Sequence, residues 1–200
     1  MLTKIINCSV PDSKKDHFSY TQQHWSALAH VNGFIGQLGG WDIDRPNEAC
    51  IIGVWDDHES YTDFMKHTHD SLFYQSGQKQ TYDSLQVNIS EKSYLAPRVY
   101  RYFRSSAMET TYMVKTTLDL HSYEDDVITD LLKEVIHPDY RCLTNIVTRL
   151  DGNSVSIFTL YGVACPPKTT QNITHQHVRR IEQQHYRLEK KWLVLAHSGS

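Results

Sequence analysis

The side chains best suited to acid–base chemistry lie in one short segment, His67-Thr68-His69-Asp70. An imidazole exchanges protons near neutral pH, and a neighbouring carboxylate can orient its ring. Residues two apart on a helix do not share a face, so only one of the two histidines can reach a given cavity. We take His69 and Asp70 as a candidate catalytic pair and His67 as a candidate ligand-binding residue. The alternative is a helix end at which histidine only complements the helix dipole.

Two amide side chains interrupt otherwise apolar segments. Asn7 lies in the first predicted strand and Gln37 in the second. An amide that faces a cavity can donate to and accept from a bound molecule, whereas one that faces outward is solvated. The sequence leaves the phase of both strands open. We treat Asn7 as a third candidate catalytic residue and Gln37 as a candidate ligand-binding residue.

Aromatic side chains gather on neighbouring predicted elements. Trp41 and Trp55 end two strands, and Phe64 follows on the next helix. Such rings can stack against a planar organic ligand or can simply pack a core. We take all three as candidate ligand-binding residues and keep core packing as the alternative.

Other chemistries find no support in the sequence. The chain lacks a G-x-S-x-G elbow, a G-x-G-x-x-G loop and a Walker phosphate loop. Its 4 cysteines show no C-x-x-C spacing, which favours buried thiols in a reducing compartment. His177 and His185, expected on a last helix, are eight residues apart, whereas helical metal sites use spacings of about three or four. We predict no metal site.

Composition and charge narrow the class of protein. The chain has 200 residues, of which 40% are hydrophobic and 22% charged, with a net charge of −3. No strong positive field would recruit nucleic acid or an anionic membrane. No apolar run approaches the ~20 residues of a membrane span, and the N-terminus lacks a signal-peptide core. We expect a cytoplasmic protein without nucleic-acid or membrane partners.

Hydrophobic periodicity predicts the order of elements in the first half of the chain. The expected strands and helices are strand 1–10, helix 14–30, strand 34–41, strand 48–55, a helix capped by Asp56 or Asp57, and strand 85–95. This β-α-β-β-α-β order is the ferredoxin-like plan. Right-handed crossovers then place both helices on one face of a four-stranded antiparallel sheet.

The second half repeats this order. The expected elements are strand 111–120, a helix carrying Val127, Leu131 and Val135, strands 140–150 and 154–163, a helix carrying Ile173, Val178, Ile181 and Leu188, and strand 192–196. We therefore expect one domain over residues 1–96, a connector over 97–108, in which an extra strand is an open alternative, and a second domain over 109–200.

These expectations define an α+β fold of tandem ferredoxin-like units. Each sheet has helices on one face only, so its other face is apolar and needs a cover. Two such faces can close into a barrel with a central cavity within one chain, as an intrachain version of a dimeric α/β-barrel. A single unit would need a second chain, and a homodimer is a further expectation for this architecture.

Three stretches of the first half resemble a known superfamily: Gly33–Trp41, Ala49–Trp55, and the helical segment from Tyr61 to Asp70. They are similar to the dimeric α/β-barrel superfamily, whose best-known members are antibiotic-biosynthesis-type monooxygenases. Within it, the chain looks closest to a small bacterial family of uncharacterised YdbC-like proteins. The resemblance covers roughly residues 1–95 and implies the fold more strongly than any reaction.

The same resemblance bears on a haem cofactor. Superfamily members that degrade haem carry an asparagine on the first strand and a tryptophan and a histidine on the second helix. This chain matches the first with Asn7, but Phe64 and Tyr74 stand at the other two positions. We therefore expect no cofactor and keep haem binding as the alternative.

Three functional hypotheses follow. The first is a cofactor-independent monooxygenase-like enzyme that acts on a planar hydrophobic or aromatic compound in the barrel cavity. The second is a non-catalytic, stress-related barrel that binds a ligand or haem. The third is a structural protein whose cavity is filled by its own side chains.

Overall fold

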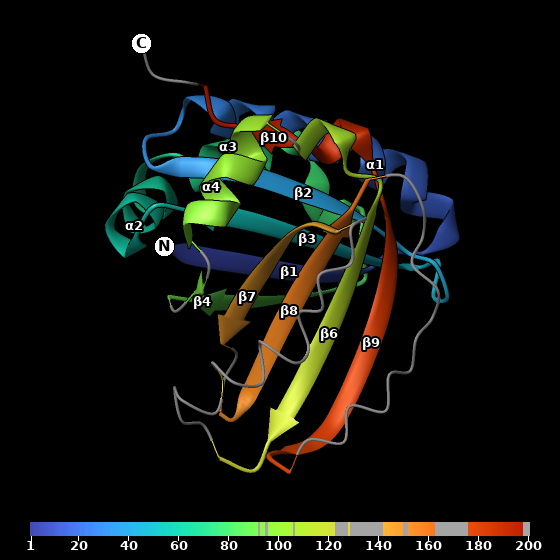
Figure 1. Ribbon diagram of the computed structural model, residues 1–200. Helices are drawn as coiled ribbons and strands as arrows, with labels where there is room; N and C mark the ends of the chain where they lie inside the picture. The colour runs from blue at the N-terminus through green and yellow to red at the C-terminus, as the bar shows by residue number, and fades with distance from the viewer. Residues whose placement is uncertain are drawn as a thin grey trace.

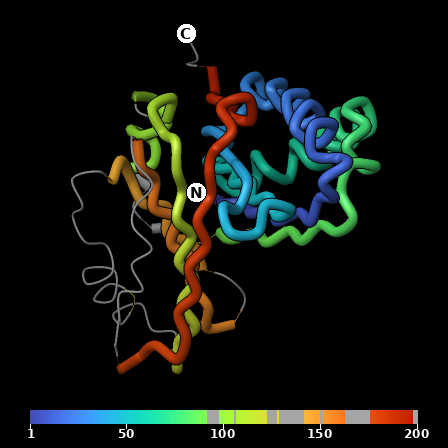
Figure 2. Tube along the Cα trace, turned by 90° about the vertical axis from the view of Figure 1, so that its right-hand side faces the viewer, coloured from blue at the N-terminus to red at the C-terminus, as the bar shows by residue number. Residues whose placement is uncertain are grey.

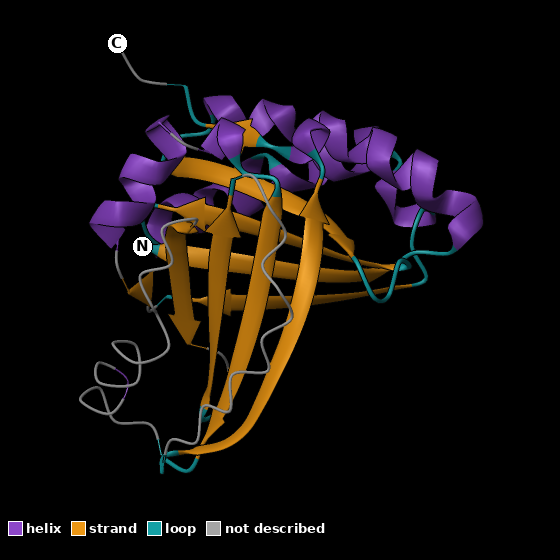
Figure 3. Cartoon of the chain, turned by 45° about the vertical axis from the view of Figure 1, so that its right-hand side comes forward, coloured by secondary structure: helices purple, strands orange, loops and turns teal. Residues whose placement is uncertain are grey.

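A computed structural model describes residues 1–91, 93–94, 96–105, 107–122, 128, 142–149, 152–162 and 176–197. Two groups of strands run in crossing directions, and the helices gather at one end and over one face of the first group (Figure 1, Figure 3). The strands are β1 Leu2–Ser9, β2 Phe34–Asp42, β3 Glu48–Trp55, β4 Ser84–Ser90, β5 Ser93–Tyr94, β6 Tyr112–Leu120, β7 Cys142–Arg149, β8 Ser154–Tyr161, β9 Val178–Leu188 and β10 Val194–Leu195. The helices are α1 Lys15–Gln22, α2 His58–His67, α3 His69–Ser76 and α4 Ala96–Ser105, with 3-10 helices η1 Asp12–Lys14, η2 Gln23–His30, η3 Gln78–Gln80, η4 Ala107–Glu109 and η5 Lys190–Trp192.

The strand order confirms the tandem ferredoxin-like plan. Within the described residues, the strands form one sheet in the order β4-β1-β3-β2-β9-β6-β8-β7-β5. The first four positions are the ferredoxin-like order, and β9-β6-β8-β7 repeats that order with β6 as the first strand of its unit. Every pairing is antiparallel. The fold is therefore α+β with two copies of the unit in one chain.

The two units are joined by a short pairing between β2 and β9. Gly40 pairs with Leu188, Trp41 with Arg187, and Asp42 with Tyr186. Figure 2 shows β9 and the chain that follows it rising beside the first unit. At the other edge, β5 follows β4 directly in the chain and pairs with β7. These two junctions bring the helix-free faces of both sheets together, as the sequence predicts.

Apolar side chains of both units fill the space between the helix-free faces. One buried cluster contains Ile5 and Ile52 from the first sheet together with Met113 and Phe158 from the second. Each of these side chains is at most 1% exposed. Burial at this density is the main source of stability for such an interface.

The connector is a helix, not the strand that the sequence left open. In α4, Val99, Tyr102 and Phe103 are buried in the cluster shared by the two sheets. Their spacing of three and four residues places them on one helical face, which explains why the segment folds as a helix. α4 lies beside β7 and β2 (Figure 1).

The expected last helix is wrong where the structure describes it. Val178–Leu188 is strand β9, which pairs with β6 along most of its length and with β2 at its end. His185 is thus a buried strand residue rather than a helical one. The spacing of Val178, Ile181 and Leu188 resembles a helical period. Hydrogen-bonded pairing with β6 and β2 nevertheless makes the segment a strand. The remaining helical residues predicted for the second unit, with Val127, Leu131, Val135 and Ile173, lie outside the described residues.

The final segment returns to the first unit. β10 pairs with β2 through Val194 and Gln37 and through Leu195 and Gly36, whereas we had expected it in the second sheet. Trp192 is fully buried there, and its indole N–H donates to Ser19 Oγ at 3.0 Å. The C-terminal segment therefore helps to cover the helical face of the first unit.

The first helix is shorter than expected. It is α-helical only to Gln22 and then tightens into the 3-10 helix η2. The Thr21 hydroxyl donates to the Phe18 carbonyl oxygen at 2.9 Å, a bond that competes with regular helical geometry. Gly33, at a φ of 72°, then turns the chain into β2. None of the described helices is long and apolar enough to cross a membrane.

Gly40 is where the junction between the units can be tested. A Cβ at this position would lie 2.0 Å from the Arg187 carbonyl oxygen, a backbone atom of β9. Gly40→Ala must therefore push β2 and β9 apart, and we expect a loss of about 3 kcal/mol in the free energy of unfolding. Gly53→Ala is the matched control in β3, because its Cβ would meet only Trp55 Nε1 at 3.8 Å. Equal denaturation midpoints for Gly40→Ala and the wild type would contradict this view of the junction.

Candidate functional site

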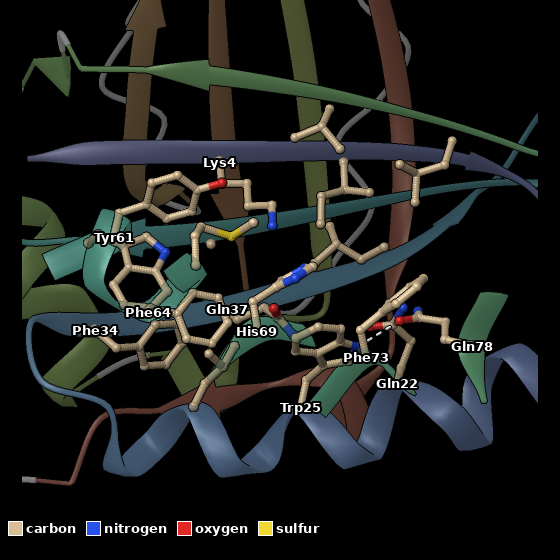
Figure 4. Close-up of a pocket in the computed structure, with 18 of the residues that line it drawn as sticks. Lys4, Gln22, Trp25, Phe34, Gln37, Tyr61, Phe64, His69, Phe73 and Gln78 are labelled. Atoms are coloured by element: carbon tan, nitrogen blue, oxygen red, sulfur yellow. Dashed lines mark hydrogen bonds between the residues drawn. The ribbon is translucent and has the colours of Figure 1, made fainter. Parts of the chain in front are cut away.

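A pocket of about 380 Å³ lies between the first sheet and the helices that cover it (Figure 4). Strands β1 to β4 form one wall, and α1, η2, α2, α3 and η3 form the other. The lining is mostly apolar and aromatic, as in typical small-molecule sites. The lining residues are Lys4, Ile6, Cys8, Gln22, Trp25, Leu28, Phe34, Gln37, Ile51, Gly53, Trp55, Tyr61, Phe64, Met65, His69, Phe73, Gln78, Tyr82, Leu85 and Val87.

Strand alternation decides which side chains reach this pocket. Along β1, Lys4, Ile6 and Cys8 line the pocket, whereas Ile5 belongs to the core between the two sheets. Because successive side chains point to opposite faces, Asn7 shares the face of Ile5. The side chain of Lys4 therefore faces the helices, and that of Asn7 faces the opposite side of the sheet.

This pocket does not lie between the two sheets, where we expected a cavity. The pocket lies on the helical face of the first sheet, and the opposite face is covered by the shared apolar cluster. The sequence shows that both faces of β3 are apolar, but it does not show which face is incompletely filled.

A break between two helices brings His69 into the pocket. The side chain of Asp57 caps α2 by accepting from the Ser60 backbone N–H at 2.8 Å, and this bond lowers the pKa of Asp57. α2 ends at His67, the backbone of Thr68 leaves helical geometry, and α3 begins at His69. The break separates the two histidines: His69 lines the pocket, and His67 lines a different hollow beside Asp63.

The His69 ring is held by aromatic side chains and one carboxylate. It stacks on Phe73 with ring centres 5.8 Å apart and planes 10° from parallel. Trp25 and Phe64 each lie 5.7 Å from it, centre to centre. Nδ1 lies 2.9 Å from Asp70 Oδ1, and the two side chains are 18% and 78% exposed. An Nδ1–H that donates to the carboxylate leaves the Nε2 lone pair as a proton acceptor.

Three further predicted residues also line the pocket. Trp55 and Phe64 lie in contact, with ring centres 4.9 Å apart. Gln37 is buried, and its side-chain N–H donates to the Trp192 carbonyl oxygen at 3.4 Å. The C-terminal segment therefore holds Gln37 in place.

The structure does not bring the remaining predicted residues to the pocket. Asn7 lies on the opposite face of β1, and His67 lies at the other hollow. Trp41 is partly buried and packs against a core cluster instead, with its ring centre 5.6 Å from that of Phe18 and 5.3 Å from that of Trp192. Asp70 reaches the site only through its bond to His69.

Sequence reasoning missed Lys4, the cationic side chain of the pocket lining. Its amino group lies 5.6 Å from the centre of the Tyr61 ring, and burial lowers its pKa to about 8. A signal was present in the sequence: Lys4 lies two residues from Leu2 and from Ile6, in phase with side chains that face the helices. A lysine in the apolar phase of a strand indicates a charge turned toward the interior.

The residues at the haem-degradation positions do not come together. Phe64 lines the pocket, whereas Asn7 lies on the opposite face of its strand and Tyr74 is 73% exposed. The three positions of the haem-degradation signature are therefore not arranged around one site in this chain. Among the described residues, no group of three or more metal-ligating side chains is placed to hold an ion.

The first unit is similar to known sequences. A family model described as "Domain of unknown function (DUF4937)" matches residues 2–90. The chain is 40% identical over 94 residues to the uncharacterized protein YdbC of Bacillus subtilis (strain 168). That alignment covers 46% of this chain and 79% of YdbC.

Comparison with solved structures covers almost the whole chain. A candidate monooxygenase of Lactobacillus acidophilus NCFM has a TM-score of 0.64 at 11% identity, with 97% of this chain and 95% of that chain covered. A candidate monooxygenase of Fusobacterium nucleatum subsp. nucleatum ATCC 25586 has a TM-score of 0.66 at 12% identity, with 94% and 91% covered. An anthrone oxidase-like protein has a TM-score of 0.56 at 10% identity, with 98% and 96% covered. At these identities the likeness shows a shared monooxygenase-like fold.

We expect the protonated Lys4 side chain to lower the free energy of unfolding. Because burial lowers the pKa of folded Lys4 from 10.5 to about 8, folding is penalised while the lysine is protonated in both states. Lys4→Met should therefore stabilise the protein by about 2 kcal/mol at neutral pH. The penalty disappears as the pH rises from about 8 toward 10.5, and the gain should shrink over that range.

Urea denaturation at several pH values measures this effect. Lys66→Met, on the exposed face of α2, is the control and should change stability little at any pH. A Lys4→Met variant that is less stable than the wild type at neutral pH would contradict the unpaired, buried state of Lys4.

Proposed function

The chain belongs to the YdbC-like family through its first unit, and we propose that it is a cofactor-independent monooxygenase-like enzyme for planar aromatic compounds. The observation that carries the proposal is the position of His69, whose ring reaches an aromatic-lined pocket of about 380 Å³ while Asp70 holds its Nδ1. Its shared fold with monooxygenase-like proteins supports the reaction class by analogy.

The aromatic lining suits a flat substrate. Trp25 and Phe73 flank the His69 ring from the helices, and Trp55 lies on the sheet side. A planar ring system can lie between these walls, where most water is excluded. In such a site a base and an acidic C–H group are held in reach of each other, which lowers the barrier to proton transfer.

The proposed reaction needs only substrate, base and dioxygen. Nε2 of His69 takes a proton from a CH₂ group that is made acidic by flanking aromatic rings and a conjugated carbonyl. The electron pair of the resulting carbanion forms a C–O bond to O₂, and the imidazolium returns its proton to the peroxide. Loss of water then leaves a ketone, so that CH₂ and O₂ become C=O and H₂O. Asp70 stabilises the imidazolium that forms between these steps.

The test uses anthrone, the compound in the name of one structural neighbour. Wild-type protein should accelerate its conversion to anthraquinone, followed by oxygen uptake and product absorbance. His69→Ala should lower the rate by about 100-fold or more, because the base is lost. Asp70→Asn should lower it less, because the imidazole remains.

His58→Ala is the matched control. His58 also lies beside a carboxylate, with Nδ1 2.8 Å from Glu91 Oε1, but this pair is outside the pocket. The control should retain the wild-type rate. Undiminished turnover in His69→Ala would refute the role of His69. Binding of anthrone without any acceleration of its oxidation would favour the non-catalytic alternative.

A further inference from the structure

Three residues form a row across the sheet wall of the pocket. In the strand register, Lys4 of β1 pairs with Gly53 of β3, and Gly53 pairs in turn with Gln37 of β2. All three line the pocket. A cationic side chain and an amide therefore flank a position without a side chain.

Gly53 leaves room for a ligand atom at the centre of this row. A Cβ added there would meet only one atom within 4 Å, the Trp55 Nε1, at 3.8 Å. The indole N–H of Trp55 thus lies beside the same open surface. It can donate to an acceptor placed over Gly53.

Lys4 has no anionic partner in this part of the chain. No carboxylate is among the lining residues, and no ion pair joins Lys4 to any described residue. Among the described residues, the face of Tyr61 is the electrostatic partner recorded for its amino group. Figure 4 shows the side chain directed into the space between the strands and the helices. An unpaired charge in an apolar site is costly, and a bound counter-charge would offset that cost.

The other titratable groups of the pocket do not supply a negative charge. Burial raises the pKa of Tyr61 and of Tyr82, and it raises the pKa of the Cys8 thiol to about 12. These three groups are therefore neutral at physiological pH. His69, on α3, is the remaining titratable group of the lining and carries no negative charge in either state. Strands β2, β3 and β4 contribute no titratable side chain to the lining.

We propose that the pocket selects aromatic acids, in that an anionic oxygen group of a planar aromatic ligand lies over Gly53 and pairs with Lys4. The aromatic body occupies the apolar space between the sheet and the helices, and the Trp55 indole N–H donates to the same oxygen group. This inference rests on the proposed function, because it takes the pocket of that function as the ligand site and names the substrate class.

Two probes that differ only in charge test the proposal. 2-Naphthoate carries a carboxylate, and 2-naphthamide has the same rings with a neutral group of similar size. Calorimetric titration of the full chain at neutral pH should show that 2-naphthoate binds at least about tenfold more tightly. Equal affinities for the two probes, or tighter binding of the amide, would overturn the proposal.

The Lys4→Met variant assigns the preference to one side chain. It should reduce the affinity for 2-naphthoate at least about tenfold and leave that for 2-naphthamide nearly unchanged. Lys66→Met, which removes an exposed lysine of α2, is the control and should keep the wild-type preference. A preference for 2-naphthoate that survives in Lys4→Met would refute the proposal, and thermal melting of each variant verifies its fold.

Two further measurements do not depend on the Lys4 variant. As the pH rises from about 7 to about 9, deprotonation of Lys4 should weaken 2-naphthoate binding by up to about tenfold but leave 2-naphthamide unaffected. Gly53→Val should weaken both probes, because its side chain fills the surface beside Trp55 Nε1. A Gly53→Val variant with wild-type affinities would contradict the placement of the anion, and a preference for the acid that does not fall over this pH range would contradict the lowered pKa of Lys4.

These binding measurements separate this inference from the proposed reaction. Selective, Lys4-dependent binding of 2-naphthoate without anthrone oxidation would retain the acid site and refute the proposed oxidation of anthrone by His69. Anthrone oxidation that depends on His69, together with equal affinity for the two naphthyl probes, would retain the reaction and refute the acid site.

Discussion

The pairing of β2 with β9 is the interaction on which the rest of the structure depends. It places the helix-free face of the first sheet against that of the second, where a shared cluster of apolar side chains covers both. With that face occupied, a cavity in the first unit must lie on its helical side. The backbone contact at Gly40 therefore determines indirectly where a ligand can bind.

Within the pocket, the two candidate functional groups come from opposite walls and have different support. His69 is fixed from the helices by stacking on Phe73 and by Asp70, so its orientation is part of the fold. Lys4 comes from the sheet and is held in a region that disfavours its charge. A side chain that costs stability where it stands is typical of functional sites. A carbonyl compound deprotonated by His69 would carry negative charge on its oxygen. That oxygen would supply the anionic partner that the pocket lining does not offer to Lys4.

The sequence predicts the elements well where each has a strong local pattern and fails where a distant contact decides. The run from Glu48 to Trp55 predicts β3 to the residue, because its apolar side chains serve both faces of the sheet. The faces of β2 could not be assigned from the sequence, since its register against β3 shifts between Phe34 and Gly36. Gln37 of β2 reaches the pocket, whereas Asn7, a similar amide on β1, lies on the face opposite to that of Lys4 and Ile6. β9 was mistaken for a helix because its pairing with β6 and β2 leaves no local signal.

The proposed ligand site lies on the helical side of the first sheet, not between the two sheets. Methyl NMR of the methionines distinguishes the two locations, because Met65 lines the pocket and Met113 is buried in the shared cluster. On titration with 2-naphthoate, the Met65 methyl resonance should shift with ligand concentration and that of Met113 should stay unchanged. A Met113 resonance that shifts while Met65 does not would place the ligand between the sheets and contradict the account.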